Sequence, residues 1–261
     1  MDDVIRVLTP LPVLLPLLGA AGALLVGRHP QLQRTLSIVV LSAVLAVSVS
    51  LLVMADSQGA TSVSVGGWPV PLGIVLVVDR LSALMLVVAN TVTLGVLVFA
   101  VGQGVADGDE TDTPLSIFHP TYLVLVAGVS NAFLAGDLFN LYVGFEVLLA
   151  ASYVLLTLGG TAGRIRAGIT YVVVSLMSSL VFLAAIGLVY AATGTVNMAQ
   201  LAVRLGELPA GTQVLLQSML LVAFGIKAGI EQCQQGYWLH FGVYCPSRCT
   251  WVMAEFYCFS D

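Results

Sequence analysis

Two charged side chains, Glu146 and Lys227, fall inside long apolar stretches of the sequence, where a charge is expensive to keep. Glu146 lies nine residues after Asp137 within residues 136–158, GDLFNLYVGFEVLLAASYVLLTL. On a helix this separation is about 13–14 Å, near the middle of a ~30 Å hydrocarbon layer. Lys227, the one lysine in the sequence, lies within LLVAFGIKAGI. Burial disfavours both charges and their attraction favours both, so small changes in distance or hydration can move a proton between them.

A static ion pair that only fixes helix packing is the alternative interpretation of Glu146 and Lys227. We favour a proton relay, because an apolar pair usually holds helices together as well or better. Gly225 and Gly229 flank the lysine and predict a local break in its helix, with freed backbone groups lining a cavity.

A polar stripe supports the relay. Tyr171, Ser175, Ser178 and Ser179 follow one another at offsets of 0, 4, 7 and 8, which places them on one face of a helix. Their hydroxyls are candidates for holding a water file between the carboxylate and the lysine. Close packing of helices through small residues explains the serines equally well.

Three further charged residues stand where apolar segments begin. Asp79 and Arg80 open one segment, and Asp137 opens the segment that carries Glu146. We interpret them as interface or capping groups in preference to a core relay, since a carboxylate at a helix start also suits the helix dipole. Asp79 and Asp137 are retained as candidates for a secondary proton path.

The composition identifies an integral membrane protein. Of the 261 residues, 59% are hydrophobic and 9% are charged, against about 25% charged in a soluble domain. The apolar runs are continuous instead of alternating, which favours helices. The predicted fold is therefore all-α and polytopic, with seven membrane-spanning segments: residues 9–26, 36–54, 79–101, 120–135, 136–158, 167–192 and 212–230.

The arginines predict the orientation of these segments. Arg28 and Arg34 lie in one loop, Arg164 and Arg166 lie in another, and both loops fall on the same side. By the positive-inside rule that side is cytoplasmic, so the N-terminus is expected outside the cell.

Two connections on the predicted outer side carry local structure. Residues 61–78 alternate around Gly66 and Gly67 and then become β-branched, which predicts a β-hairpin. Residues 196–208 predict a short helix lying in the membrane interface, with Asn197 as its N-cap and Gln200 three residues later.

The residues also exclude several classes of function. The first 230 residues hold no phosphate-binding loop, dinucleotide fingerprint or metal-ligand spacing, so we expect no cofactor and no metal. Nothing resembles a basic nucleic-acid-binding surface. The four cysteines lie in the last 31 residues, and their spacing does not match a known zinc pattern: Cys233, Cys245, Cys249 and Cys258.

Four segments carry a family resemblance: HPTYLVLVAGVSNAFLAGD, GDLFNLYVGFEVLLAASYVLL, RAGITYVVVSLMSSLVFLAAIGLVY and VAFGIKAGI. In order and spacing they closely resemble the D-type subunit of the Mrp-type cation/proton antiporters, which is homologous to the antiporter-like, proton-pumping subunits of respiratory complex I. The resemblance covers roughly residues 1–230.

This resemblance implies a fold of about fourteen transmembrane helices, with inverted five-helix repeats and a discontinuous seventh helix. It implies a functional pair of a glutamate and a lysine, which falls here on Glu146 and Lys227. It further implies a hetero-oligomer with other membrane subunits, in a prokaryotic cell membrane, that exchanges sodium ions for protons. Protons, sodium ions and the lipid bilayer are thus the expected partners.

After Ile230 the sequence departs from the family pattern. We therefore predict two regions, residues 1–230 as helices 1–7 of an antiporter-like membrane domain and residues 231–261 as a non-native tail that follows a truncation. Three alternatives remain: a proton-pumping subunit of a complex I-like or membrane hydrogenase assembly, a fragment that does not transport, and, less favoured, a seven-helix receptor with a Schiff base on Lys227.

Overall fold

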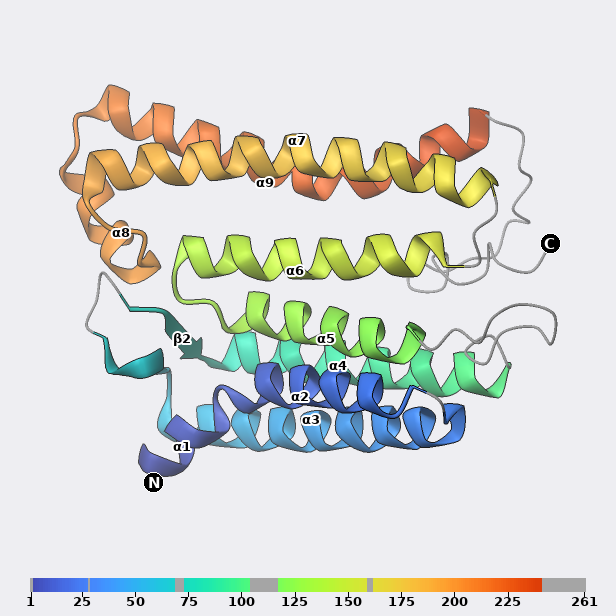
Figure 1. Ribbon diagram of the computed structural model, residues 1–261. Coiled ribbons are helices and arrows are strands. Elements are labelled where there is room, and N and C mark those ends of the chain that lie inside the picture. The colour runs from blue at the N-terminus through green and yellow to red at the C-terminus, as the bar shows by residue number, and fades with distance from the viewer. Residues whose placement is uncertain (1, 28, 69–72, 104–116, 159–161, 241–261) are drawn as a thin grey trace.

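The computed structural model describes residues 2–27, 29–68, 73–103, 117–158 and 162–240 and forms a bundle of antiparallel helices (Figure 1). The longer helices follow the continuous apolar runs, because backbone groups in an apolar environment must be satisfied within their own segment. The α-helices of the described residues are α1 (Asp2–Leu8), α2 (Leu11–Leu25), α3 (Pro30–Gln58), α4 (Arg80–Gly102), α5 (Phe118–Leu134), α6 (Leu138–Thr157), α7 (Ala162–Thr193), α8 (Met198–Arg204) and α9 (Ala210–His240).

The helices divide into two groups with α6 between them (Figure 1). α2, α3, α4 and α5 pack together on one side of α6, and α7 and α9 lie side by side on the other. One apolar core joins α2–α5, around Leu97, Leu123 and Val126. A second joins α6–α9, around Phe182, Ile186 and Leu201. α6 therefore contacts both groups.

Each end of the bundle has its own structure. One end carries the strands β1 (Thr61–Ser64) and β2 (Val75–Val78) together with α8, and we call it the hairpin end. The other end carries Arg34 near the start of α3 and Arg166 near the start of α7, and we call it the arginine end. Arg34 donates from Nη2 to the Val101 carbonyl at 2.6 Å, which joins α3 to the end of α4.

The apolar segments predicted from the sequence are all helical. Six stretches are long and apolar enough to cross a membrane within the described residues, and α5 is apolar but has 17 residues. At the N-terminus the helix starts earlier than predicted, at Asp2, and breaks at Thr9 and Pro10. Pro12 then falls in the first turn of α2, where the N–H that proline lacks has no partner in the helix.

The predicted break beside Lys227 is wrong. α9 runs as one helix through Gly225 and Gly229 to His240, ten residues beyond the predicted end of this segment at Ile230. A glycine in a helix interior costs only about 1 kcal/mol relative to alanine. Breaking the helix in an apolar environment would cost more, because each unsatisfied backbone group costs several kcal/mol there.

The predicted hairpin is present. β1 and β2 pair antiparallel from Thr61 opposite Val78 to Ser64 opposite Val75. Gly66 and Gly67 both have φ of 72°, a left-handed conformation that glycine adopts without a steric penalty. The loop residues 69–72 lie outside the described residues.

The predicted short helix is also present, as α8 with a 3₁₀ turn at Leu205–Glu207. Asn197 caps it by accepting from the Ala199 and Gln200 backbone N–H groups at 3.1 and 3.2 Å. The Gln200 side chain does not close a capping box and instead accepts from the Thr195 hydroxyl at 2.7 Å.

A backbone junction at the hairpin end ties α6 to both groups of helices. The Gly136 N–H donates to the Val75 carbonyl at 2.8 Å, the Leu138 N–H donates to the Val196 carbonyl at 2.9 Å, and the Met198 N–H donates to the Gly136 carbonyl at 3.0 Å. A Cβ on Gly136 would meet Val77 Cγ2 at 2.6 Å, so the close approach requires glycine. The start of α6 is thus fixed between β2 and α8.

α5 and α6 pack at close range along their length. A Cβ on Gly128 would lie 2.7 Å from the Leu148 backbone nitrogen, and one on Gly144 would lie 3.1 Å from the Ala132 backbone nitrogen. Asn131 and Asn140 exchange side-chain hydrogen bonds across this contact at 3.1 and 3.3 Å. The helix that carries Glu146 is therefore held firmly against α5.

Candidate proton-transfer site

Glu146, Ser179 and Lys227 meet between α6, α7 and α9, and we call them the relay triad. Lys227 Nζ lies 2.7 Å from Ser179 Oγ and 3.4 Å from Glu146 Oε1. Ser179 in turn donates to Glu146 Oε1. The Lys227 side chain is 11% exposed and the Glu146 side chain is 30% exposed. The two charges that lie inside apolar stretches of the sequence are thus in contact across 81 positions of the chain.

Ser179 occupies the middle of a directional chain of hydrogen bonds. An ammonium can only donate and an ionised carboxylate can only accept, whereas a hydroxyl does both. Lys227 donates to Ser179, and Ser179 donates to Glu146. A proton can therefore pass from the lysine to the carboxylate if the hydroxyl accepts one proton while it releases another. The reverse transfer needs only that the hydroxyl turn around.

Two other serines of the predicted stripe are buried on α7 beside the triad. Ser175 and Ser178 are each 1% exposed; the Ser178 hydroxyl has no hydrogen-bond partner among the described residues, and the Ser175 hydroxyl lies beside that of Tyr153. Tyr171 lies further toward the arginine end and shares a hydrogen bond with Ser152 of α6 at 3.1 Å. The Tyr171 ring also packs edge-on against Tyr153, with ring centres 5.1 Å apart. The stripe thus continues from the triad toward the arginine end.

Asp137 and Asp79 lie at the hairpin end, away from the triad. Asp137 is 5% exposed and accepts from the Asn140 N–H at 2.6 Å and from the Val75 N–H at 3.4 Å. Asp79 forms a capping box with Ser82, in which the Ser82 N–H donates to Asp79 Oδ1 at 2.6 Å. These backbone and side-chain hydrogen bonds from Ser82 lower the pKa of the Asp79 carboxyl below its usual value. Both aspartates are N-caps of the helices that they precede.

Arg80 forms a surface pair with Asp56, from Nε to Oδ1 at 3.1 Å, and both side chains are well exposed, by 70% and 75%. Such an exposed pair contributes little to stability. Its position at the hairpin end agrees with the interpretation of Arg80 as an interface group.

Sequence reasoning missed several groups around the triad. Ser152 and Tyr153 lie six and seven residues after Glu146, and their spacing from Tyr171 gives no signal in the sequence. The aromatic residues Tyr142, Phe145, Phe182 and Phe224 pack together on the other side of the triad, and in the sequence they resemble ordinary core residues. The asparagine pair Asn131–Asn140 was also not predicted.

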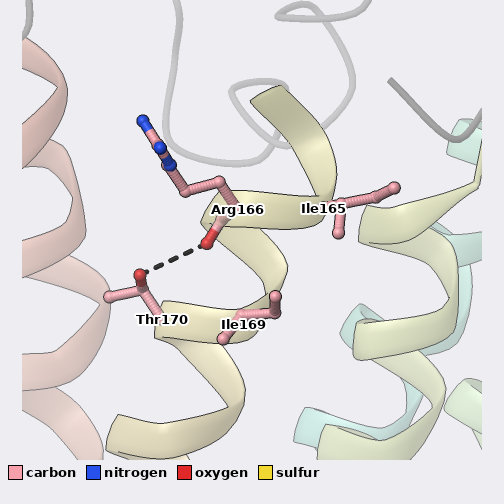
Figure 2. A pocket seen from close by; sticks show the side chains of 4 residues that line it. All are labelled: Ile165, Arg166, Ile169 and Thr170. Carbon is pink, nitrogen blue, oxygen red and sulfur yellow. Dashed lines mark hydrogen bonds between the residues drawn. The ribbon is translucent and has the colours of Figure 1, made fainter. Parts of the chain in front are cut away.

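A shallow hollow of about 370 Å³ at the arginine end of α7 carries none of the triad residues. Figure 2 shows its lining by Ile165, Arg166, Ile169 and Thr170, and the hydrogen bond from the Thr170 hydroxyl to the Arg166 carbonyl at 3.3 Å. Thr170 precedes Ser179 by nine residues, which is about 13 Å along the helix. Within the described residues, no group of three or more His, Cys, Asp or Glu side chains could hold a metal ion.

Comparison with known families defines the class of protein. Residues 135–240 match the model of the transmembrane region of the NADH:quinone oxidoreductase/Mrp antiporter family. The matched region includes α6, α7 and α9 and so contains the whole relay triad. Residues 135–240 are thus similar to the transmembrane region that this family model describes.

Individual relatives are more specific. The chain is 40% identical over 221 residues to the D-type subunit of the Na(+)/H(+) antiporter of Alkalihalophilus pseudofirmus, with 84% of this chain and 44% of that protein covered. It is 38% identical to the D-type subunit of a probable K(+)/H(+) antiporter of Rhizobium meliloti, with 88% and 43% covered. A protein of the Mrp complex from Dietzia sp. matches with a TM-score of 0.75 and 30% identity, over 85% of this chain and 41% of that one.

These matches confirm the predicted resemblance to the D-type antiporter subunits and the predicted polytopic α-helical fold. The named relatives are transporter subunits, as expected, and they weaken the complex I-like alternative. The chain spans a little under half the length of these relatives. The prediction that residues 231–261 form a non-native tail stays a prediction, and residues 241–261 lie outside the described residues.

Proposed function

We propose that this chain forms the proton-transfer region of a membrane antiporter subunit that exchanges sodium ions for protons. The observation that supports this most directly is the hydrogen-bonded series Lys227–Ser179–Glu146 inside an apolar bundle. A carboxylate and an ammonium at this depth mark an ion or proton pathway by default. We infer sodium as the exchanged cation from the relative named as a Na(+)/H(+) antiporter subunit. Potassium is the alternative, because another relative is named as a probable K(+)/H(+) antiporter subunit.

In this proposal the relay triad has two states. In the closed state Lys227 is charged and held by Ser179 and Glu146, as in the structure. In the open state Glu146 has taken a proton through Ser179, the pair is neutral, and Lys227 is released to exchange protons with a further group. Neutralising the pair removes the attraction between α6 and α9, so proton transfer and helix movement are coupled.

The surroundings of the chain follow from the same proposal. The exposed apolar side chains of α7 and α9 face lipid or other membrane subunits of a hetero-oligomeric complex, in the cell membrane of a prokaryote. We further propose that the arginine end is cytoplasmic and the hairpin end is external, because of the positive-inside rule. Ser175, Ser178 and Tyr171 then lie on the cytoplasmic side of the triad, as a secondary path.

The test is cation-dependent proton movement in inverted membrane vesicles from cells that produce the chain in its native complex. Addition of sodium chloride to energised vesicles should release protons for the unmodified chain, and Glu146→Gln and Lys227→Met should each abolish that release. Glu207→Gln changes an exposed glutamate at the hairpin end and serves as the matched control. Normal exchange by both triad variants at normal expression would refute the relay. Release by potassium chloride alone would refute sodium as the substrate but not the relay.

A further inference from the structure

A cluster of four aromatic rings packs on one side of the relay triad, whereas the other side carries the separate pair Tyr153–Tyr171. Phe182 is fully buried and lies at the centre, with ring-centre distances of 6.0 Å to Tyr142, 6.3 Å to Phe145 and 4.9 Å to Phe224. These four residues come from α6, α7 and α9, the three helices that supply the triad. We call them the aromatic layer.

Sequence offsets place the aromatic layer toward the hairpin end. Tyr142 precedes Glu146 by four residues on α6, which runs away from the hairpin end, and Phe224 precedes Lys227 by three residues on α9, which runs in the same direction. Phe182 follows Ser179 by three residues on α7, which runs toward the hairpin end. Offsets of three and four keep Tyr142, Phe182 and Phe224 on the faces of their triad neighbours, about 4.5–6 Å nearer the hairpin end. Phe145 directly precedes Glu146, about 1.5 Å nearer that end.

The opposite side of the triad is polar. The buried hydroxyls of Ser178 and Ser175 lie one and four residues from Ser179 toward the arginine end, and the bonded pair Tyr171–Ser152 lies beyond them. A buried hydroxyl without a partner costs free energy that an ordered water recovers. The Ser178 hydroxyl, 1% exposed and without a partner among the described residues, therefore marks a site for internal water on this stripe of hydroxyls.

We propose that the aromatic layer seals the relay triad from the hairpin end and that water reaches it only from the arginine end, through the hydroxyls of α7. This proposal rests on the proposed function, because it assigns the direction from which the relay takes its protons. Apolar constrictions exclude water by dewetting, and three rings packed around the fully buried Phe182 form such a constriction. Phe182 is the central residue of the seal, because it contacts each of the other three rings.

The test measures water access directly, with Ser179→Cys as the reporter. The chain is produced in its complex with its four native cysteines replaced by serine, and a small, charged, membrane-impermeant methanethiosulfonate is applied to one side of the vesicles at a time. Arg166→Cys and Glu207→Cys identify which side leads to the arginine end and which leads to the hairpin end. Because dewetting blocks the sealed side, we expect reaction from the arginine side to be faster by at least about ten-fold.

A second variant tests the seal itself. Phe182→Ala, combined with Ser179→Cys, should raise the reaction rate from the hairpin side by about ten-fold or more, because removal of the central ring opens the layer to water. Phe182→Leu keeps an apolar side chain there and should leave that rate low. Equal rates from the two sides in the Ser179→Cys chain, faster reaction from the hairpin side, or no reaction from the arginine side would each overturn the proposal.

Labelling does not depend on transport, so the two proposals fail separately. One-sided labelling with normal exchange by Glu146→Gln would refute the relay and retain the seal. Two-sided labelling with no exchange by Glu146→Gln would refute the seal and retain the relay.

Discussion

The Lys227 ammonium lies closer to the Ser179 hydroxyl, at 2.7 Å, than to the carboxylate that balances its charge, at 3.4 Å. Ser179 therefore connects the two charged groups through its own hydrogen bonds. The Ser179 hydroxyl can pass a proton between Lys227 and Glu146 in either direction. Without it, a proton could move only across the direct contact between the ammonium and the carboxylate.

Removal of the Ser179 hydroxyl should slow exchange without removing either charge. With Ser179→Ala, protons must cross the longer direct contact, and we expect a loss of about a hundred-fold, at the lower end of what a positioned proton-transfer group contributes. Ser179→Thr keeps the hydroxyl and should restore most of the rate. The measurement is the initial rate of sodium-dependent proton release in vesicles. Equal rates for Ser179→Ala and the unmodified chain would show that the hydroxyl is a bystander.

Breaking the charge pair should destabilise the bundle more than removing the pair as a whole. Glu146→Gln leaves a buried ammonium without its counter-ion, and because Glu146 is 30% exposed we expect a loss of about 1–3 kcal/mol, below the 3–5 kcal/mol of fully buried pairs. The double variant Glu146→Gln, Lys227→Met should recover part of that loss. Thermal unfolding of the purified complex in detergent measures the stability of the single and the double variant. A double variant no more stable than Glu146→Gln alone would contradict a net penalty for the isolated charge.

Close packing of α5 on α6 should make Gly128 intolerant of a methyl group. In Gly128→Ala the new Cβ would lie 2.7 Å from the Leu148 backbone nitrogen, so the helices must separate. We expect a loss of about 1–3 kcal/mol, typical of overpacking. Gly95→Ala on α4 is the matched control, since its Cβ meets nothing within 4 Å and alanine favours the helix by up to about 1 kcal/mol. Similar melting temperatures for the two variants would argue against close packing of α5 on α6 at Gly128.

Stability should depend on the ionisation of Asp79 at acidic pH. The pKa of this carboxyl is lowered in the folded chain by hydrogen bonds from Ser82, so its contribution is fully present above the usual aspartate pKa of 3.8 and is lost as the pH falls through the lowered value. Asp79→Ala should cost about 0.5–2 kcal/mol at neutral pH, as for other N-caps. The difference from the unmodified chain should shrink below pH 3.8.

Asp79→Asn separates the cap from its charge. The amide oxygen can still accept from the Ser82 N–H, so this variant should keep most of the stability at neutral pH and lose the acid dependence. Unfolding in detergent across this pH range checks both variants. A constant difference between Asp79→Ala and the unmodified chain at all pH values would mean that the carboxylate charge contributes nothing.

The main features of the candidate site could be predicted from the sequence, because charge is rare and costly in an apolar segment. Glu146 and Lys227 stand out by composition alone, and the spacing of the α7 serines places them on one helix face. Which serine touches the pair could not be predicted, because Ser178 and Ser179 are adjacent and differ by about 100° around the helix. The rotation of α7 decides between them, and the packing of Phe182 fixes that rotation only in the folded bundle.

Other features depend on contacts between distant segments. Asn131 and Asn140 are ordinary polar residues in the sequence, and their pairing depends on the close approach of α5 and α6 at Gly144. The break expected beside Lys227 is absent, because exposing backbone groups to an apolar environment costs more than keeping glycine in a helix. Glycine was a sound guide at Gly66 and Gly67, where a turn requires positive φ.

The hydrogen-bonded junction around Gly136 holds the start of α6 in place, so a tilt of α6 would pivot about this point. The first residue of α6, Leu138, is tied to the segment before α8, while Glu146 lies eight residues along the helix, about 12 Å from that point. A tilt of about 10° at this point would move the carboxylate by about 2 Å, because the displacement grows with this length along the helix. That distance is enough to open the contacts of Glu146 with Ser179 and Lys227. A small rotation of α6 at the hairpin end would therefore make or break the hydrogen bonds of the triad.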